Sequence, residues 1–417
     1  MVAVASLLVI ALAAPRPILA QMAESGTRVR LGAHAIGMVS RVDPGIGGVV
    51  ETEGYLTQPM IHGHATLWSG LFTIAGTLNL EGLTMPGGEL APGNAGEGFV
   101  DRRHPHTFMH ELMATFSPRL TGIDFTLSAG RGFAPFGTDD PMTRPFVRYP
   151  ANHHWSQILE RWTITAAARL GMVTIEAGLF NGDEPEAPED LAGVERVGDS
   201  RAVRATLRPA HSLELQASHA YVESPGFRAG PGLDHRQWSA SARLDHALSP
   251  SSRLYVFLEM AETNEYDGDR KVFVFTSVLG ETAWRPGPWT AALRFERTTR
   301  PEEERLVDPY RSQRPHAEAS ILGATRWNTV TAHAARSFPN RGLRFEPFAE
   351  LSRSTVDEIT GAIFDPLALY GSTELWSLSI GLRLTAGLQH DRMGRYGAAL
   401  PPGVSLADHE MSMTGRQ

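Results

Sequence analysis

Apolar and polar residues alternate along many segments of this chain. In the segment 213–222, which reads Leu-Glu-Leu-Gln-Ala-Ser-His-Ala-Tyr-Val, the odd positions are mostly apolar and the even positions are small or polar. A two-residue period is typical of a β-strand with one apolar and one polar face. The same rhythm returns many times between Ala65 and Leu388. The pattern therefore predicts a chain made mostly of amphipathic strands.

The connections between these strands alternate in length. Tight connections, most of them containing Pro, Gly or Ser, are expected at 117–121, 170–172, 209–212, 248–252, 285–288 and 338–342. Longer connections are expected at 82–104, 132–157, 181–200, 223–235, 264–270, 300–315 and 354–373. Short periplasmic turns that alternate with longer outer loops are typical of outer-membrane barrels, whereas a soluble β-sandwich has no reason to show this alternation.

The number of strands is even under two interpretations of the N-terminal region. Counting from a strand at 65–81, and taking 317–337 as one long strand, gives about 14 strands, and a weaker hairpin of 29–41 and 48–58 raises this to about 16. Single-chain bacterial barrels normally have an even number of strands. We therefore predict an all-β fold, a transmembrane antiparallel β-barrel of about 14–16 strands, over residues 21–390.

The two ends of the chain differ from this pattern. Residues 1–20 are almost wholly apolar and end on Ala20, which predicts a signal peptide cleaved before Gln21. A short membrane anchor is the alternative, but the apolar run falls short of the ~20 residues that a helical span needs. Residues 391–417 are interpreted as a polar C-terminal tail or an irregular closing element. An exported barrel of this kind belongs in the outer membrane of a Gram-negative bacterium, with the surrounding lipid and the barrel-assembly machinery as partners.

Composition and charge exclude several functions. The chain has no cysteine, so it has neither disulfides nor thiolate metal sites. A net charge of −8 on 417 residues is mild and does not indicate nucleic-acid binding. Mixed signs on the predicted lumen faces fit either a modestly selective channel or a lumen cross-linked by ion pairs. The charged residues in question are Arg161, Arg169, Arg243, Arg294, Arg344 and Arg383 with Asp124, Glu176, Glu214, Glu296, Glu346 and Glu350.

Three histidine-bearing blocks are candidates for chemistry. The densest is 101–106, Asp-Arg-Arg-His-Pro-His, and the others are 152–155, Asn-His-His-Trp, and 60–64, Met-Ile-His-Gly-His. Imidazole binds Zn, Cu and Ni, and Met is a soft ligand suited to Cu(I). The first two blocks end long outer loops, whereas the third falls on the periplasmic side. A single site that uses all three blocks is therefore not expected.

The first two blocks have a structural and a metal interpretation. As a structure, they form one side-chain network just inside the outer mouth, with an imidazole of one block close to an imidazole of the other. The charged members of this loop network are Asp101, Arg102 and Arg103. As a metal site for Cu or Zn, the candidate ligands are His104, His106, His153 and His154. The structural interpretation is favoured, because the spacing lacks the paired ligands of known zinc motifs.

A catalytic site has weaker support in the sequence. A hydrolase needs a Ser or Thr near a His and an orienting acid, and Ser156 follows two histidines closely. Closeness along the chain does not establish closeness in space. The sequence contains no phosphate loop, dinucleotide fingerprint or nucleophile elbow.

The same blocks resemble a known family. The run 100–106 followed by 109–112 is similar to the D-R-Q-H-P-H … M-E-L block of a family of uncharacterised proteobacterial proteins with expected outer-membrane barrels. The segments 152–155 and 180–185 resemble its G-H-H-W-Q and F-N-G-R-E-P-D blocks, in the same order. Arg103 stands where the family usually has Gln, and the C-terminal end diverges. The resemblance implies an outer-membrane barrel without an established substrate, and a metal-stress context, because members often accompany heavy-metal resistance functions.

Three functions follow from these observations. The leading hypothesis is a porin-like channel or passive outer-membrane component, with no enzymatic activity and no cofactor. The second is a metal-handling barrel with a histidine-rich mouth for Cu or Zn. The third is a barrel enzyme that acts on lipid.

Overall fold

The computed structural model describes residues 27–92, 102–191, 193–225, 232–303, 321–340, 342–361, 364–389 and 392–401. Almost all secondary structure in these ranges is β-strand. The strands are β1 (Arg28–Asp43), β2 (Glu51–Leu67), β3 (Phe72–Asn79), β4 (Glu89–Leu90), β5 (Arg102–Arg103), β6 (Met109–Phe116), β7 (Asp124–Gly132), β8 (Arg161–Leu170), β9 (Val173–Phe180), β10 (Ser200–Ala210), β11 (Leu213–Val222), β12 (Asp234–Ser249), β13 (Ser252–Asp267), β14 (Arg270–Pro286), β15 (Trp289–Glu303), β16 (Ile321–Arg336), β17 (Phe338–Asn340), β18 (Leu343–Gly361) and β19 (Glu374–Gly387).

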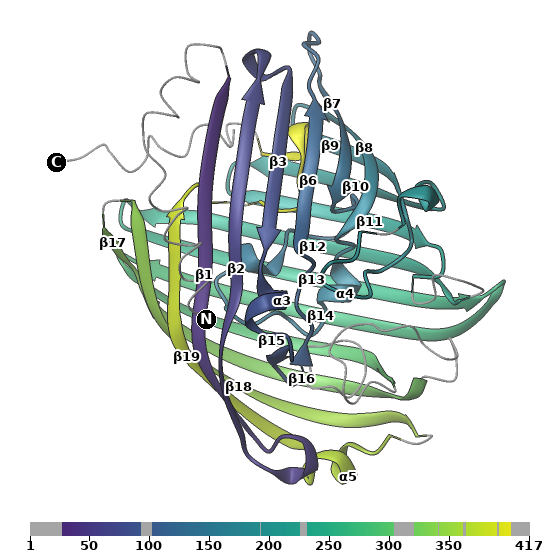
Figure 1. Cartoon of the computed structure of the whole chain (residues 1–417), viewed down its shortest axis with the longest axis vertical. Helices are drawn as coiled ribbons and strands as arrows, with labels where there is room; N and C mark the ends of the chain where they lie inside the picture. Colours follow the sequence, from purple (N-terminus) through teal and green to yellow (C-terminus); the bar gives the residue numbers. More distant parts are fainter. Residues whose placement is uncertain are drawn as a thin grey trace.

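Apart from the small β4–β5 pair, these strands form one antiparallel sheet that closes on itself. Each strand pairs with its neighbours in the sheet, and β1 pairs with β19 to close the ring (Figure 1). Because β17 continues β16 along the same edge of β18, the described strands occupy sixteen positions in the ring. The expected all-β antiparallel barrel with an even number of strands is therefore confirmed.

The barrel is apolar outside and polar inside. In β9, Thr174 and Glu176 are buried on the lumen side, whereas Ile175 and Leu179 are each 49% exposed on the outer side. Leu258 and Ile380 on other strands are more than half exposed in the same way. A continuous exposed apolar surface is stable only against lipid, so the outer face is the membrane-contacting face. No helix in the described ranges is long and apolar enough to cross a bilayer.

Three expected boundaries are wrong, and the first is the start of the expected loop 354–373, because β18 stays paired up to Gly361. The expected strand 65–81 is broken by a turn at Trp68–Gly70, whose residues all have positive φ, so β2 ends at Leu67 and β3 begins at Phe72. The expected long loop 264–270 is a tight turn, because β13 and β14 continue their pairing up to Asp267 and Arg270. The turn at Trp68–Gly70 was missed because it carries Trp68 between Leu67 and Leu71 and so reads as apolar strand. The strand ends at 264–270 were missed because polar lumen-facing residues resemble a loop.

The two ends of the barrel differ in their connections. One end carries the turns after β2, β6, β8, β10, β12 and β14, and we call it the short-turn end. The opposite end carries the long loops 80–108, 133–160 and 181–199, and we call it the long-loop end. The first residue of β1 and the last residue of β19 both lie at the short-turn end, which is the periplasmic end in barrels of this type.

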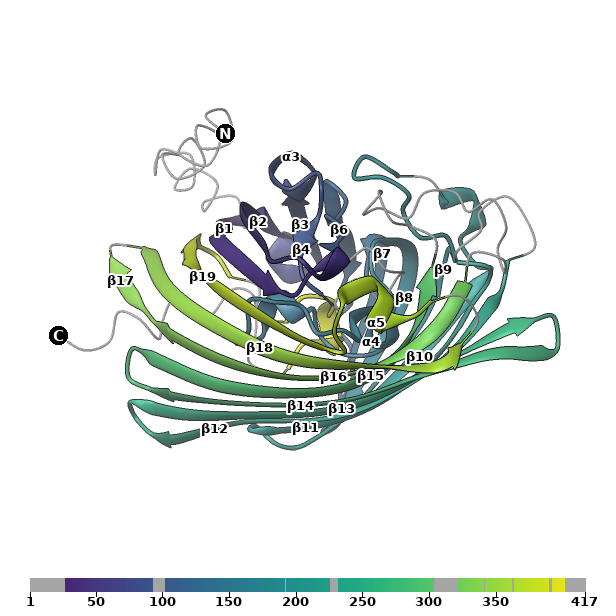
Figure 2. The same ribbon diagram turned by 90° about the horizontal axis from the view of Figure 1, so that it is seen from below.

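Besides the loop 80–108, which packs against β1 and β2, two segments fold into the lumen and determine where any site can lie. The first is the loop 133–160 between β7 and β8, which contains the short helix α4 (His153–Ser156) (Figure 2). The second is the C-terminal segment 392–401, which follows β19 and turns back into the barrel with a short 3₁₀ turn at Gly397–Ala399. The expected signal peptide 1–20 and the residues after 401 lie outside the described residues.

Candidate functional site in the barrel lumen

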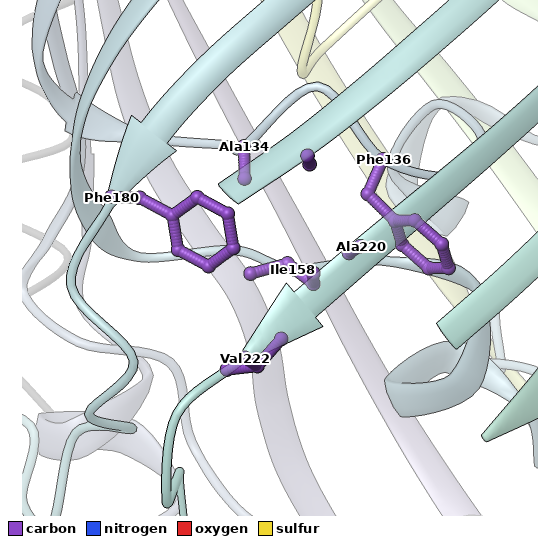
Figure 3. Close-up of a cluster of buried hydrophobic side chains, with 7 residues drawn as sticks. Ala134, Phe136, Ile158, Phe180, Ala220 and Val222 are labelled. Atoms are coloured by element: carbon purple, nitrogen blue, oxygen red, sulfur yellow. The ribbon is translucent and has the colours of Figure 1, made fainter. Parts of the chain in front are cut away.

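Apolar side chains fix the loop 133–160 to one wall of the lumen. Phe136 and Ile158 of the loop pack against Phe180 and Val222 at the ends of β9 and β11 (Figure 3). Burial of side chains of this size contributes about 1.5–3 kcal/mol each. Gly137 permits the close approach of the two halves of the loop, because a Cβ at that position would lie 1.7 Å from the carbonyl oxygen of Ser156 in α4.

The loop then crosses the lumen to the opposite walls. Phe146 packs against apolar residues of β13, β14 and β15, and Val147 packs against β1, β16 and β18. Carboxylates of the wall accept hydrogen bonds from the loop backbone: Glu350 accepts from the N–H groups of Val147 and Arg148 at 2.9 and 3.1 Å. The loop is therefore a packed partition across the barrel rather than a flexible outer segment.

A buried ion-pair network lies on the β2 side of this partition. Arg103 donates hydrogen bonds to Glu81 at 2.7 Å and to Glu89 at 3.0 Å, and its guanidinium stacks 4.5 Å from the ring centre of Tyr149. Glu81 also lies 2.8 Å from Nδ1 of His106. Burial alone would raise the pKa of Glu81, but Arg103 and His106 hold it well below its usual range. Glu81 is therefore a buried carboxylate stabilised by two partners.

A second pair of carboxylates continues the network through a further histidine. The rings of His106 and His110 meet edge to face at 4.8 Å, and Nδ1 of His110 lies 2.9 Å from Glu160. Asp140 lies 3.7 Å from the other ring nitrogen of His110. Burial would raise the pKa of Glu160, but the hydrogen bond with His110 lowers it to about 2. Glu160 adopts a φ of 59°, a strained conformation for a non-glycine residue, which the surrounding contacts maintain.

The two histidine blocks expected to meet are brought together. The ring centres of His104 and His154 are 5.4 Å apart, and those of His153 and His154 are 4.1 Å apart. These side chains and His106 line a small cavity of about 40 Å³, which we call the histidine cavity. Burial lowers the pKa of His153 well below its usual range, and the neighbouring His154 acts in the same direction, so this imidazole is neutral at physiological pH.

The charged residues of the first block have separate fates. Arg103 belongs to the buried network described above. Arg102 instead points to β2, where it pairs with Glu53 at 2.7 Å and approaches Glu51 at 3.8 Å. Asp101 lies outside the described residues. The third block, as expected, is directed elsewhere: its His62 lines a cavity at the short-turn end.

The described residues contain no group of three or more His, Asp or Glu side chains arranged to hold a metal ion. The arrangement of the imidazoles in the histidine cavity is that of packed rings with hydrogen bonds to the loop, such as the 3.2 Å contact between Nδ1 of His153 and the carbonyl of Pro150. Ser156, which follows the second histidine block in the sequence, has no exposed surface and lies inside the barrel, away from lipid.

The C-terminal segment is joined to the loop 133–160 by ion pairs. Asp139 of the loop contacts Arg392 and Arg395 of the segment and Arg243 of β12. Burial alone would raise the pKa of Asp139, but these guanidinium groups hold it far below its usual range. Tyr396 completes the junction by accepting a hydrogen bond from the N–H of Phe133 at 3.0 Å. The lumen is therefore filled from both ends, and the two segments meet at Asp139.

A much larger cavity of about 600 Å³ lies at the short-turn end, below the partition. Eight arginine side chains and three carboxylates line it, and we call it the arginine cavity. The arginines are Arg144, Arg208, Arg243, Arg253, Arg285, Arg344, Arg383 and Arg392, and the carboxylates are Glu214, Asp245 and Glu346. Arginine binds carboxylate and phosphate groups through a planar fork of N–H donors, so this cavity is chemically suited to anions.

Sequence reasoning missed the carboxylates that organise the lumen. Glu81 and Glu160 lie at the edges of expected strands and loops, where an acidic residue is ordinary. Arg392 and Arg395 stand in a segment interpreted as a polar tail. Two arginines three residues apart, with Tyr396 directly after them, were the one signal that this segment binds something.

Comparisons with known proteins agree with the architecture. No protein-family model and no curated protein matches the chain. Among solved structures, it is similar to an anion-selective porin from Comamonas acidovorans, with a TM-score of 0.52 and 12% identity over 86% of this chain and 99% of the porin. The Pseudomonas aeruginosa protein OccK2 (OpdF), solved in complex with glucuronate, has a TM-score of 0.41 and 11% identity over 87% and 98% of the two chains. The first likeness shows the fold alone: the chain is a closed antiparallel β-barrel similar to that of the porin.

Proposed function

We propose that this barrel is a porin-like passive channel for small hydrophilic solutes in the outer membrane of a Gram-negative bacterium. The observation that carries the proposal is the polar cavity of about 600 Å³ inside a closed barrel whose outer face is apolar. A barrel of 16 strands is wide enough for an aqueous channel. The lipid around the apolar face and the machinery that inserts barrels are then its partners.

The loop 133–160 and the segment 392–401 narrow this channel strongly. Both are largely buried and are fixed by hydrogen bonds and ion pairs to the wall and to each other. We therefore expect a conductance well below that of a 16-stranded barrel with an open lumen. Solutes pass between the partition and the wall, and large polysaccharides or peptides are excluded.

Single-channel recording tests this proposal directly. The full-length chain, folded in detergent and inserted into a planar bilayer, is expected to give discrete conductance steps in KCl. Folding is checked by the difference in gel migration between heated and unheated samples, which is typical of intact barrels. A folded preparation that inserts and gives no conductance above the protein-free bilayer would overturn the proposal.

A metal-handling role is the second candidate, supported by the meeting of His104, His153 and His154 around one cavity. The resemblance to a family found beside heavy-metal resistance functions is consistent with it. The test adds micromolar Zn(II) or Cu(II) to the same bilayer recording. A block that is lost in a His104→Ala/His154→Ala variant supports this role, and unchanged currents exclude it. Nothing in the described lumen favours a lipid-acting enzyme, because Ser156 is fully buried inside the barrel.

A further inference from the structure

We propose that the arginine cavity is a binding site for a small anion with two or more acidic groups, carboxylate or phosphate. If this anion is also the solute that crosses the barrel, the inference rests on the proposed function. The binding site itself does not depend on that function, because a ligand can bind from the periplasmic side without crossing. The argument comes from the charges, the cross-strand pairing and the donor atoms that face the cavity.

The charges of the cavity wall are not balanced. Most of its arginines have a carboxylate partner: Arg208 pairs with Glu214 at 2.8 Å and Arg383 pairs with Glu346 at 2.9 Å. The others of this kind are Arg144 with Glu259 and Glu281, Arg243 and Arg392 with Asp139, and Arg253 with Asp245. Arg285 and Arg344 form no ion pair with any residue that the structure describes. The wall therefore holds two guanidinium groups that have no carboxylate in ion-pair contact.

The position of Arg285 makes its charge more costly. It is the direct cross-strand partner of Arg253, on neighbouring strands β14 and β13. Like charges placed directly opposite each other destabilise an antiparallel pair. Asp245 binds Arg253 at 2.8 Å, and its charge also acts on Arg285, so one carboxylate serves two arginines. An anion in the cavity supplies the missing charge for Arg285.

Arg344 faces the cavity from a different part of the wall. It lies on β18, three strand positions from Arg285 on β14 and four residues along the strand from Phe348, which is in register with Arg285. The two backbone positions are therefore about 14 Å apart across the strands and about 13 Å apart along them. Both side chains line the same cavity of about 600 Å³. A ligand with two separated acidic groups reaches both guanidinium groups, whereas a chloride ion reaches only one.

Individual donor atoms at the cavity also lack partners. Nε of Arg383 and Nε2 of His34 are buried, line the cavity, and have no hydrogen-bond partner among the described residues. An anion bound in the cavity would give both atoms a hydrogen-bond partner. His34, Thr385 and Arg344 follow one another across β1, β19 and β18, so these groups form one row that faces the ligand.

The test measures binding of citrate and of inorganic phosphate to the detergent-solubilised full-length chain by titration calorimetry. The two probes separate a polycarboxylate from a phosphate ligand, and glucose is the neutral control. We expect saturable binding of at least one anion and none of glucose. The variant Arg285→Gln/Arg344→Gln is expected to weaken binding at least tenfold, because both changed side chains lack carboxylate partners and supply charge-assisted hydrogen bonds to the anion. The control Arg353→Gln removes one positive charge from an exposed pair with Glu374 near the long-loop end and is expected to bind like the original chain.

Thermal stability gives an independent readout. Without an anion, the single variant Arg285→Gln is expected to melt at a higher temperature than the original chain, since the Arg253–Arg285 repulsion is removed. With citrate, the order is expected to reverse. No saturable binding of either anion by the folded original chain, or equal binding by the double variant, would overturn the site. Binding without any conductance would instead keep the site and remove the channel, so the two proposals fail separately.

Discussion

The two cavities inside this barrel are built from the same kind of wall and are filled in opposite ways. At the long-loop end, the histidine cavity holds about 40 Å³, and the buried arginine beside it contacts carboxylates. At the short-turn end, the arginine cavity holds about 600 Å³ and contains guanidinium groups without partners. At the long-loop end, balanced charges hold a loop in place. At the short-turn end, the excess of positive charge leaves guanidinium groups that can bind an anionic ligand. The balance of charge, rather than the residue type, distinguishes structure from binding here.

The largest expected effect comes from removing the partition that separates the two cavities. Replacement of 134–157 by a short Gly-Ser linker joins both into one lumen, and we expect conductance to rise about fivefold or more, as for an unobstructed 16-stranded barrel. Bilayer recording checks the size of the step. The substitution Gly137→Ala is a smaller version of the same change, because its Cβ would overlap a carbonyl of the loop. An unchanged conductance after deletion would show that the loop does not restrict the path.

Breaking the charge balance at the long-loop end is expected to be the next largest effect. Arg103→Gln leaves Glu81 and Glu89 buried without their cation, and loss of one partner of a buried pair costs about 3–5 kcal/mol. The heating midpoint at which gel migration changes is expected to fall. Adding Glu81→Gln is expected to restore part of the loss, and Arg353→Gln is expected to leave the midpoint unchanged. An unchanged heating midpoint in Arg103→Gln would contradict the role assigned to this network.

A smaller effect is expected at the junction of the two ends. Truncation after residue 390 removes Arg392 and Arg395 and leaves Asp139 with Arg243 as its cation. We expect conductance to increase about twofold, less than after loop deletion, because the loop keeps its contacts with the wall. Truncation after residue 401 keeps the described segment and is the matched control. Equal conductance in both truncated chains would show that the segment 392–401 does not narrow the path.

The smallest expected effect is a dependence on pH. Burial holds the pKa of His153 below its ordinary value of 6.5, so the unfolded loop binds a proton that the folded loop does not, and stability is lost as pH falls below 6.5. Glu81 has a lowered pKa as well, and its contribution is lost only as pH falls below its ordinary value of 4.5. Conductance is expected to rise slightly from pH 7 to pH 5. His153→Gln is expected to reduce the change in conductance between pH 7 and pH 5. An equal or larger change in this variant would contradict the assignment.

The sequence predicted the wall of the barrel well, because its physics is local. Alternation within one strand reports which face meets lipid, and residues such as Ile175 and Glu176 need no distant information to be assigned. The junction at Asp267 was misplaced because a polar lumen-facing residue and a polar turn residue look the same in sequence. The junction at Leu67 was missed because its turn carries Trp68 between two leucines and so reads as strand.

The arrangement inside the barrel was predicted only where a loop carries a recognisable sequence motif. Histidine-rich blocks at the ends of two long loops indicated a meeting inside the mouth, and His104 and His154 do meet. Their carboxylate partners were missed, because Glu81 and Glu160 are brought in by the path of the loops and not by any local motif. The arginine cavity was also missed, since its residues come from many strands and appear in the sequence only as scattered charges of mixed sign.

The junction at Asp139 connects segments that enter the barrel from its two opposite ends. The loop 133–160 enters from the long-loop end, and the segment 392–401 enters from the short-turn end. Arg392 and Arg395 both contact Asp139 of the loop and Glu214 of β11, so the segment is joined to the loop and to the wall at once. A displacement of the segment 392–401 is therefore transmitted to the loop 133–160, and the two ends of the barrel are mechanically coupled through one aspartate.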